Sequence, residues 1–573
     1  MKTRMNFSQE VPLASLARIR TSFRIARSRR APRFSKLFPI PEKADQGVRR
    51  GPGGPPYHFA FVVLLAQSVY AGNTYPLPAS DGAAEIEWIT PSTFRFHRVW
   101  KAELDSKPDR ASEMVAVDRS VEKGVIEFRS KHLVVKIHEQ TLAIEVMDGH
   151  EKVLLHENRG VELIDGQIVL ARRIADKEDF VGLGPRTDER LGARGMVIES
   201  QTPFLISTAG YGMDYSSAGK FRFDFGNTNR AEARTIISGA HRVEYLFHYG
   251  PGPKEVFEER GKWLPPIEFR EEDVGVRAGA RLPKYARKLD KQTDSCKAVA
   301  ALVHASMTGT RVPALSPEDY PGDANIELLA QIAPMVYRKD WSNPTGLRKR
   351  LAPFLITYLQ EATEKGYPMI HPLPMQFPED AAGLERSDEF MLGDEMLVAP
   401  FCGEQKQRTV YLPRGNWTSL TGGPAITGRQ TITIEAKAGE LPIFVKNGAV
   451  LPLAPLNDDG PMEMHYYPKL GGEFFIWEPD ADFISQLHAS PALDYFRVES
   501  ETRKERVYEW VLHHMEEPKE VQMVDGPTFE RARNAEAMGL NRWMFDPATK
   551  EVRVRIQAKA GGHEIVNIWL INR

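Results

Sequence analysis

The fold of this chain is decided by two neighbouring runs, Pro368-Met-Ile-His-Pro-Leu-Pro-Met-Gln-Phe-Pro-Glu-Asp380 and Asp388-Glu-Phe-Met-Leu-Gly-Asp-Glu-Met-Leu-Val-Ala-Pro400. Before them, residues 347–362 place apolar side chains at helical spacing, and Gly366 follows as a helix-stop signal. From Gly393 onward the alternation typical of strands takes over. The two runs therefore mark the passage from a helical segment into β-structure.

An N-terminal β-sandwich is predicted over residues 83–262. Leu133, Val135 and Ile137 fall on alternate positions, and Asp148-Gly149 supplies a turn. Short alternating strands separated by turns are typical of an antiparallel sandwich.

The middle segment, residues 267–379, is predicted to be helical. Apolar spacing indicates a helix over Ser295 to Ser306, and Asp323 is a good N-cap for a second helix that reaches Tyr337. We expect Pro334 and Pro353 to kink the last two helices of the segment.

Strands return in the C-terminal part, where Val552, Val554 and Ile556 alternate with Arg553 and Arg555. We predict a proximal β-domain at residues 380–460 and a distal one at 461–573. The whole chain is thus predicted to be a mainly β multidomain protein with a short helical segment in the middle.

Charge is unevenly distributed along the 573 residues. The formal net charge is −2, but residues 1–50 hold 13 Lys and Arg against 3 Asp and Glu, which leaves 62 against 74 for the rest. The body of the chain is therefore acidic, which argues against nucleic acid as a partner.

Residues 1–71 are predicted to be a disordered basic leader followed by a signal peptide. Arg49-Arg50, the apolar run Phe59 to Ala66 and small residues ending near Ala71 form the three regions of an export signal. Eight apolar residues are too few for a membrane-spanning helix, so no span is expected after cleavage. A buried strand is the alternative. Because no Met occurs between Met5 and Met114, we expect translation to start near Val48.

No metal or other cofactor is expected. The two cysteines, Cys296 and Cys402, match no metal or redox spacing, and the fifteen His include no His-Glu-x-x-His. Each cysteine is expected to be a small buried residue, with a disulfide as the alternative if the chain is exported. His513-His514 is interpreted as strand surface.

The two deciding runs resemble the junction in glycoside hydrolase family 31, the α-glucosidase and α-xylosidase family, where the last barrel helix passes into a C-terminal β-domain. The resemblance continues on both sides, in Val181-Gly-Leu-Gly184, Thr202-Pro-Phe-Leu-Ile-Ser207, Phe223-Asp-Phe-Gly226, Arg408-Thr-Val-Tyr-Leu-Pro413, Gly415-Asn-Trp417 and Leu441-Pro-Ile-Phe-Val-Lys-Asn-Gly448.

This resemblance implies a catalytic (β/α)8 barrel, for which the chain is too short. Such barrels need about 250 residues. Between Pro265 and Pro372 the chain offers 372 minus 265, or 107, which is three or four βα units at about 30 residues each. We therefore expect a truncated barrel remnant.

The family's catalytic carboxylates are also not found in their motifs. The nucleophile Asp of relatives lies in a Trp-x-Asp-Met-Asn-Glu run that is absent here, and their acid/base Asp follows a Gly, as Asp323 follows Gly322. Asp323, Asp319 and Glu327 are the candidates for an acid pair. A helix N-cap at Asp323 and a turn at Asp319 are the structural alternatives.

The resemblance places Arg338 and Trp341 where family members line the substrate pocket. Several aromatic residues of the C-terminal half could stack on sugar rings if they are exposed, or else belong to the core: Trp417, Tyr466, Tyr467, Phe474, Phe475 and Trp477.

Three functions follow from this sequence. The first is an exported, catalytically deficient family member that at most binds carbohydrate. The second is an active α-glycosidase whose carboxylates come from unexpected positions or from another chain in an oligomer. The third is a non-functional deletion product. Self-association is left open.

Overall fold

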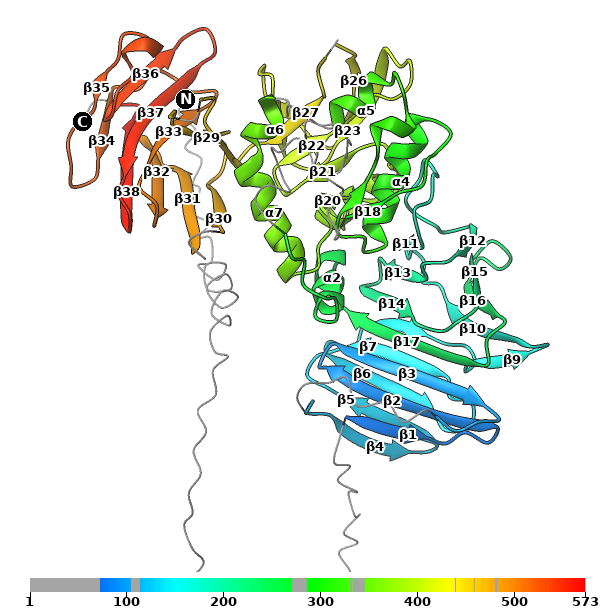
Figure 1. The fold of residues 1–573 in the computed structure, drawn as a ribbon. Coiled ribbons are helices and arrows are strands. Elements are labelled where there is room, and N and C mark those ends of the chain that lie inside the picture. The colour runs from blue at the N-terminus through cyan, green and yellow to red at the C-terminus, as the bar shows by residue number, and fades with distance from the viewer. Residues whose placement is uncertain are drawn as a thin grey trace, which may run out of the picture. The chain divides into compact units, whose positions relative to one another are not determined.

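A computed structural model describes residues 73–104, 114–269, 286–329, 332, 346–437, 439–457, 459–479 and 483–571. The chain divides into two units, residues 1–68 and 69–573. The predicted leader and signal peptide, and also Arg338 and Trp341, lie outside the described residues. Within those residues, no helix combines the length and apolar character needed to cross a bilayer. The second unit is mainly β, as predicted (Figure 1).

Three antiparallel sheets form the N-terminal part and share one core. β-structure starts earlier than predicted, at Thr74, because Tyr75 and Leu77 are buried. The first sheet has the order β1 (Thr74–Leu77), β2 (Gly82–Thr90), β3 (Thr93–Trp100), β17 (Arg242–Tyr249), β14 (Tyr211–Tyr215), β13 (Phe204–Ser207), β11 (Phe180–Gly182). The second is β12 (Val197–Ser200), β15 (Lys220–Phe225), β16 (Glu232–Ser238), β10 (Gln167–Arg173), β9 (Glu162–Ile164), and the third is β4 (Asp118–Glu122), β5 (Val125–Arg129), β6 (Leu133–His138), β7 (Ile144–Asp148), β8 (Val153–His156).

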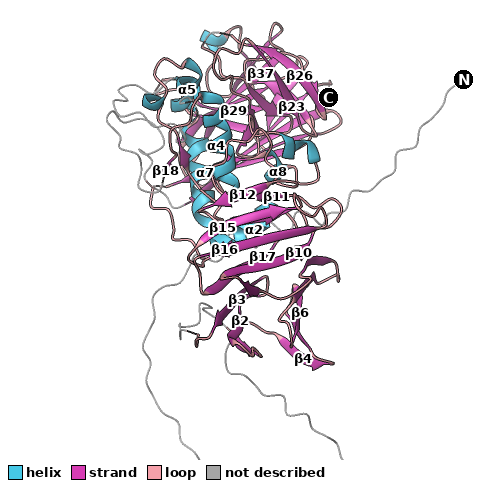
Figure 2. Cartoon of the chain, turned by 90° about the vertical axis from the view of Figure 1, so that its right-hand side faces the viewer, coloured by secondary structure: helices cyan, strands magenta, loops and turns pink. Residues whose placement is uncertain are grey.

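The middle segment contains helices and one short parallel strand pair. After α2 (Pro253–Gly261), strand β18 (Arg287–Lys288) pairs in parallel with β19 (Pro313–Ala314), and α4 (Ser295–Met307) makes the crossover between them. The other elements are η1 (Pro317–Asp319), α5 (Ala324–Leu329), α6 (Gly346–Arg350) and α7 (Ala352–Glu364). Figure 2 shows α4, α5 and α7 among the sheets. The sequence predicted the helices but not the parallel pairing of β18 with β19.

The apolar stripe before Gly366 is divided between α6 and α7. Phe354, Leu355, Tyr358, Leu359 and Ala362 are buried on α7, as predicted. The predicted kink at Pro353 is wrong, because this residue lies in the first turn of α7, where a missing N–H breaks no helical hydrogen bond. Pro334 and the end of the second predicted helix lie outside the described residues.

The start and the end of the middle segment meet at Arg311. Its Nη2 donates to the carbonyl oxygen of Pro265 over 2.7 Å. Its own carbonyl oxygen accepts from the backbone N–H of Met369 over 2.8 Å. The two ends of the segment are therefore held side by side.

The β-structure that follows starts at Ile370. One sheet has the order β20 (Ile370–His371), β21 (Phe390–Leu392), β22 (Met396–Val398), β27 (Ile443–Lys446), β24 (Asn416–Ser419), β25 (Ile426–Thr427). β23 (Gln407–Leu412) and β26 (Gln430–Glu435) form a separate antiparallel ribbon, and α8 (Leu373–Gln376) and η3 (Ala381–Glu385) lie between β20 and β21. The β21–β22 hairpin turns at Gly393, which has φ +60°.

Two further sheets complete the chain. The first has the order β28 (Val450–Leu453), β29 (Met462–Tyr466), β33 (Arg506–Leu512), β37 (Glu551–Ala558), β36 (Arg542–Asp546), β35 (Glu530–Arg531). The second is β30 (Gly472–Glu478), β31 (Phe483–Pro491), β32 (Tyr495–Thr502), β38 (Gly562–Trp569), β34 (Glu520–Met523). Because β28 pairs with β29, the predicted boundary at residue 460 falls within the first of these sheets.

The core of the C-terminal half contains most of the aromatic residues considered as sugar-stacking candidates. Trp417, Tyr466, Tyr467 and Phe474 are buried, and Phe354 of α7 stacks on Phe474 at 5.5 Å between ring centroids. The core interpretation is confirmed for these four. Phe475 and Trp477 are partly exposed on the other face of β30.

Candidate functional site

The structure places Asp323 as the N-cap of α5. Its Oδ1 accepts hydrogen bonds from the backbone N–H groups of Asn325 and Ile326, at 3.0 and 3.4 Å. A carboxylate in this position satisfies helix N–H groups that have no partner within the helix. The capping interpretation of Asp323 is therefore confirmed.

The structure also shows the surroundings of the other two acidic candidates, Asp319 and Glu327. Asp319 ends η1, and its Oδ2 lies 2.9 Å from Nζ of Lys288. Glu327 is exposed on α5, one turn after Asp323. Asp319 is thus a turn residue held by a lysine of β18, and Asp323 is used by its own helix.

Cys296 and Cys402 form a disulfide, so the expectation of two separate buried thiols is wrong. Cys296 lies in the first turn of α4, and Cys402 follows β22. The bond joins positions 106 residues apart and ties the β18–α4–β19 unit to the sheet that begins at β20.

Two adjacent acids after Gly393 have opposite pKa shifts. Nζ of Lys254 lies 2.9 Å from Oδ1 of Asp394, and Nδ1 of His371 lies 3.3 Å from it. Partial burial raises the pKa of Asp394, but the hydrogen bond to His371 and the charge of Lys254 outweigh it and hold this pKa below its usual range. Burial, with the neighbouring Asp394 charge, raises the pKa of Glu395 to about 8. Glu395 accepts from the hydroxyl of Tyr358 at 2.7 Å.

Opposite pKa shifts of two neighbouring carboxyl groups also occur in catalytic acid pairs. Here, however, Asp394 is held in an ion pair with Lys254 of α2, and Glu395 is buried against Tyr358 of α7. The two carboxyl groups therefore fix the hairpin between β21 and β22 to the helices beside it.

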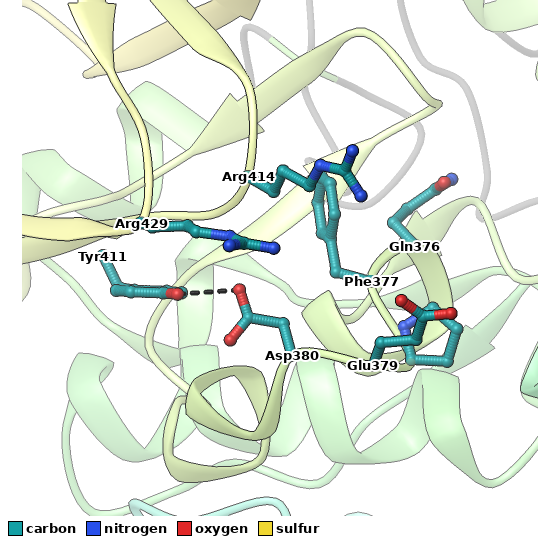
Figure 3. A pocket seen from close by; sticks show the side chains of 8 residues that line it. Gln376, Phe377, Glu379, Asp380, Tyr411, Arg414 and Arg429 are labelled. Atoms are coloured by element: carbon teal, nitrogen blue, oxygen red, sulfur yellow. Dashed lines mark hydrogen bonds between the residues drawn. The ribbon is translucent and has the colours of Figure 1, made fainter.

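A pocket of about 400 Å³ opens between the end of α8 and the β23–β26 ribbon (Figure 3). Its lining residues come from two stretches, one at the end of α8 and one on the ribbon: Gln376, Phe377, Pro378, Glu379, Asp380, Tyr411, Arg414 and Arg429. The ribbon register pairs Leu412 with Gln430, which brings Arg414 and Arg429 to the same end of the two strands.

Asp380 and Tyr411 form the fixed part of this pocket. Oδ1 of Asp380 accepts from the backbone N–H of Ala382 at 3.2 Å, so Asp380 caps η3. Its Oδ2 accepts from the hydroxyl of Tyr411 at 2.7 Å. Burial and this hydrogen bond raise the pKa of Tyr411 to about 12, although the nearby Arg429 lowers it. Tyr411 therefore remains a protonated donor at neutral pH.

The two arginines are the adaptable part of the pocket. Arg414 and Arg429 are exposed, and neither forms an ion pair with a described residue. Figure 3 shows Arg429 extending toward Tyr411 and Asp380. Arg429 has φ +59°, in the turn that leads into β26, and its backbone N–H donates to Leu412 over 2.7 Å. Its backbone is thus fixed while its guanidinium group stays available.

Phe377 supplies the apolar surface. Its ring is partly exposed, with the ring centroid of Trp417 at 6.3 Å in an edge-to-face arrangement and Nζ of Lys446 at 5.5 Å from the Phe377 centroid. Ligand pockets commonly combine an apolar or aromatic wall with a few convergent polar groups. Guanidinium donors and carboxylate acceptors beside an aromatic ring suit a neutral molecule with many hydroxyl groups.

Sequence reasoning did not identify this pocket. Phe377-Pro-Glu-Asp380 was visible within the deciding run, but no spacing rule connects it with Tyr411, Arg414 or Arg429. Those residues meet only because the β23–β26 ribbon folds over the end of α8.

Comparison with known proteins identifies the segment that contains the pocket. Residues 366–451 match the glycosyl hydrolase family 31 C-terminal domain, and all eight lining residues fall within this match. An α-glucosidase of Saccharolobus solfataricus is 33% identical over 120 residues, which are 21% of this chain and 17% of the relative. Alpha-glucosidase 2 of Bacillus thermoamyloliquefaciens is 29% identical over 201 residues, 31% of this chain and 25% of the relative. The matches thus span a quarter or less of these curated relatives.

Solved structures show the same fold over more of the chain. A family 31 dextranase of Flavobacterium johnsoniae, complexed with glucose, has a TM-score of 0.71 at 14% identity, and the match covers 87% of this chain and 98% of that one. A cycloalternan-forming enzyme of Listeria monocytogenes, in complex with a pentasaccharide substrate, has a TM-score of 0.70 at 13% identity, with 88% and 77% covered. At such identity the likeness is one of fold. Residues 366–451 thus match the C-terminal domain of glycosyl hydrolase family 31, and the relatives and solved structures that resemble this chain support membership of that family.

Proposed function

We propose that this chain is an exported, carbohydrate-binding member of family 31 that lacks the catalytic carboxylate pair of its relatives. The observation that carries the proposal is the pocket beside α8, in which Arg414, Arg429 and Glu379 surround the partly exposed ring of Phe377. We propose that this pocket binds a neutral saccharide.

The hydrogen-bonding groups of the pocket support this ligand class. The two guanidinium groups donate, and the carboxylates of Glu379 and Asp380 accept, so adjacent sugar hydroxyls can be met by both kinds of partner. The ring of Phe377 can cover an apolar sugar face. With two positive and two negative side chains, the lining has no excess charge that would require an ionic ligand.

Three observations support the lack of catalysis. The nucleophile motif of the family is absent from the sequence. Asp323 caps α5, and Asp319 lies beside Lys288. Retaining glycosidases need two carboxyl groups about 5 to 5.5 Å apart across the scissile bond, and these two acids are instead used by a helix end and a lysine.

Export is supported by the predicted signal peptide ending near Ala71 together with the Cys296–Cys402 disulfide. Disulfides persist in oxidising compartments and are rare in the cytosol. The location we propose is therefore periplasmic or extracellular.

We propose the following domain arrangement, in which the predicted boundaries are shifted to the ends of the sheets. An N-terminal β-sandwich is followed by a truncated barrel remnant that contains β18, α4 and β19. A proximal β-domain begins near Ile370 and a distal one near Val450, where the strands of the respective sheets start.

Saccharide binding is tested by calorimetry on the purified full-length chain. Isomaltotriose is a suitable probe because a dextranase of similar fold has been crystallised with it. We expect the Arg429→Gln and Phe377→Ala variants to bind at least about tenfold more weakly, a loss of about 1.4 kcal/mol. Arg230→Gln is the matched control, since Arg230 is exposed on the N-terminal part, far from the pocket in sequence. Equal binding by all three variants would contradict the assignment of the pocket.

Catalysis is tested separately with aryl α-glucoside and aryl α-xyloside. We expect no turnover. Turnover that is lost in Asp323→Asn would instead establish an active glycosidase with an unexpected carboxylate. Insoluble or protease-labile protein would favour a deletion product without function.

A further inference from the structure

Four titratable side chains form one row near the start of the distal sheets. Glu463 and His465 lie on β29, His513 follows directly after β33, and Glu551 begins β37. Nε2 of His465 lies 2.8 Å from Oε2 of Glu463, and its Nδ1 lies 2.9 Å from Nε2 of His513. Nδ1 of His513 lies 3.2 Å from Oε1 of Glu551. β33 pairs with both β29 and β37, so the sheet itself holds this row in register.

The number of protons in the row follows from its three contacts. A carboxylate only accepts, so Nε2 of His465 and Nδ1 of His513 must each carry a proton. The contact between the two rings needs one more proton, on one of the two facing nitrogens. Three N–H protons on two imidazoles make one imidazolium and one neutral imidazole.

The surrounding charges fit a single positive charge between two carboxylates. Nη2 of Arg350, from α6, lies 2.7 Å from Glu463, and Nη2 of Arg553, from β37, lies 3.3 Å from Glu551. Partial burial raises the pKa of Glu463, but the hydrogen bond to His465 and the charge of Arg350 lower this pKa to about 2. The pKa of Glu551 also falls to about 2, mainly through its hydrogen bond to His513. Both carboxylates are therefore ionised at neutral and mildly acid pH.

The row also connects separate parts of the fold. The ring of Tyr467 stacks on His513 at 4.3 Å between centroids, and Nε2 of His514 lies 3.0 Å from the hydroxyl of Thr418 on β24. The backbone of Arg350 is bonded to Ala454, next to β28. α6, β24 and the distal sheets thus meet near the two histidines. The other charged groups close to the row are Lys550, which acts on His514, and Glu509, which is bonded to Arg553.

We propose that His465 and His513 share a single proton, and that this pair acts as an acid-sensitive clasp between β29 and the residues that follow β33, next to the contacts of this region with α6 and β24. When a second proton enters, each facing nitrogen carries an N–H, and the 2.9 Å contact becomes repulsive. The clasp then opens.

The direction of the pH effect follows from burial. Burial lowers the pKa of His465 below its usual value near 6.5, and the charges of His513 and Arg350 act in the same direction, against the raising effect of Glu463. Below about pH 6.5 the histidines of the unfolded chain therefore bind a second proton that the folded pair does not yet bind. The contribution of the pair to stability is therefore greatest near pH 6.5: it falls at lower pH, where the unfolded chain binds the second proton first, and it falls at higher pH, where only the folded chain still holds the shared proton.

The test uses the full chain labelled with ¹⁵N-histidine. At pH 7.5 we expect the His465 and His513 rings to carry three N–H protons in total, with signals assigned by their loss in His465→Gln and His513→Gln. On acidification to pH 4.5 a fourth proton should enter, together with a change in the His514 signal. Two N–H protons at pH 7.5, one on each ring, would overturn the proposal, and so would four.

Thermal unfolding gives an independent readout. Between pH 6.5 and pH 5 we expect the midpoint of His513→Gln to rise relative to that of the wild-type chain, because an amide can turn its oxygen toward a protonated His465, whereas a second proton on the histidine pair brings two N–H groups together. The control is His563→Gln, whose exposed imidazole pairs with Glu499 on the neighbouring sheet. An equal change of the midpoint between pH 6.5 and pH 5 in all three proteins would contradict the clasp. The labelled wild-type experiment remains decisive even if the His513→Gln variant does not fold.

Discussion

The hydroxyl of Tyr411 donates to Oδ2 of Asp380 over 2.7 Å and thereby fixes the β23–β26 ribbon to the turn that follows α8. One hydrogen bond thus joins the two stretches that line the pocket. Because the acceptor is a carboxylate and the bond is partly buried, its removal should be felt both in stability and in ligand binding.

Tyr411→Phe is expected to lower the free energy of unfolding by about 1 to 3 kcal/mol, the range for a hydrogen bond to a charged group. It should also weaken saccharide binding, because Asp380 is left without one of its two donors. Denaturant unfolding and calorimetry measure the two effects. Tyr495→Phe is the control, since no side-chain hydrogen bond of the Tyr495 hydroxyl is present among the described residues. Equal effects of both substitutions would show that the contact with Asp380 contributes nothing specific.

Gly393→Ala is expected to destabilise the chain strongly for two reasons. A Cβ at this position would lie 2.3 Å from the ring of Tyr358, and the residue has φ +60°. Left-handed backbone costs a non-glycine residue about 1 to 2 kcal/mol, and overpacking adds about 1 to 3 kcal/mol.

Gly403→Ala separates the cost of the left-handed backbone from the cost of overpacking. Gly403 has φ +56°, but nothing lies within 4 Å of a Cβ placed there. We therefore expect Gly403→Ala to show only the backbone term in denaturant unfolding. If the two substitutions cost the same, the contact of Gly393 with Tyr358 has no energetic role.

Stability is expected to depend on pH through Glu395. Its pKa of about 8 lies above the usual value near 4.5, so the folded chain retains a proton that the unfolded chain releases. The contribution of Glu395 is therefore fully present below about pH 4.5 and is lost as the pH rises toward 8. Glu395→Gln keeps an acceptor for Tyr358 and should flatten this part of the stability profile.

The pH experiment compares unfolding free energies at pH 5 and pH 8 for wild type, Glu395→Gln and the exposed control Glu404→Gln. Other buried acids, such as Glu157 and Glu389, also have raised pKa values. They give all three proteins the same additional dependence of the unfolding free energy on pH. The difference between the variants isolates Glu395. An unchanged slope in Glu395→Gln would refute this assignment.

Reduction of the disulfide is expected to destabilise the region that contains α4. Closing a loop of about 100 residues restricts the unfolded chain, and loss of a native disulfide typically costs about 2 to 5 kcal/mol. Unfolding with and without reductant measures this cost. The double variant Cys296→Ser/Cys402→Ser should be insensitive to reductant and should match the reduced wild type. If it is as stable as the oxidised protein, the bond does not stabilise the fold.

Local sequence patterns predicted those parts of the fold that have their own periodicity. The buried stripe of α7 and the N-cap at Asp323 were readable because helical spacing and capping chemistry are local. The parallel pairing of β18 with β19 was missed because strands of two residues have no alternation to detect. The mainly β character was readable from many short alternating runs.

The candidate site was less accessible to sequence reasoning because it depends on contacts between distant segments. Tyr411 and Asp380 are 31 residues apart, and nothing in their neighbourhoods indicates that they meet. Similarly, His513 was interpreted as strand surface, although it follows β33 and contacts His465 from another strand. The Cys296–Cys402 pairing could not be chosen from spacing, since two isolated cysteines fit either a disulfide or two thiols.

The meeting of Pro265 and Met369 at Arg311 has a consequence for how such a chain can vary in length. A segment whose two ends are adjacent has the geometry of an insertion, because its removal or enlargement leaves the anchoring points where they are. The sheets that precede Pro265 and those that follow Met369 can then keep their own pairings while the part between them grows or shrinks. Such an attachment fits the truncated barrel remnant that we propose, because the flanking domains do not depend on the length of the segment between them.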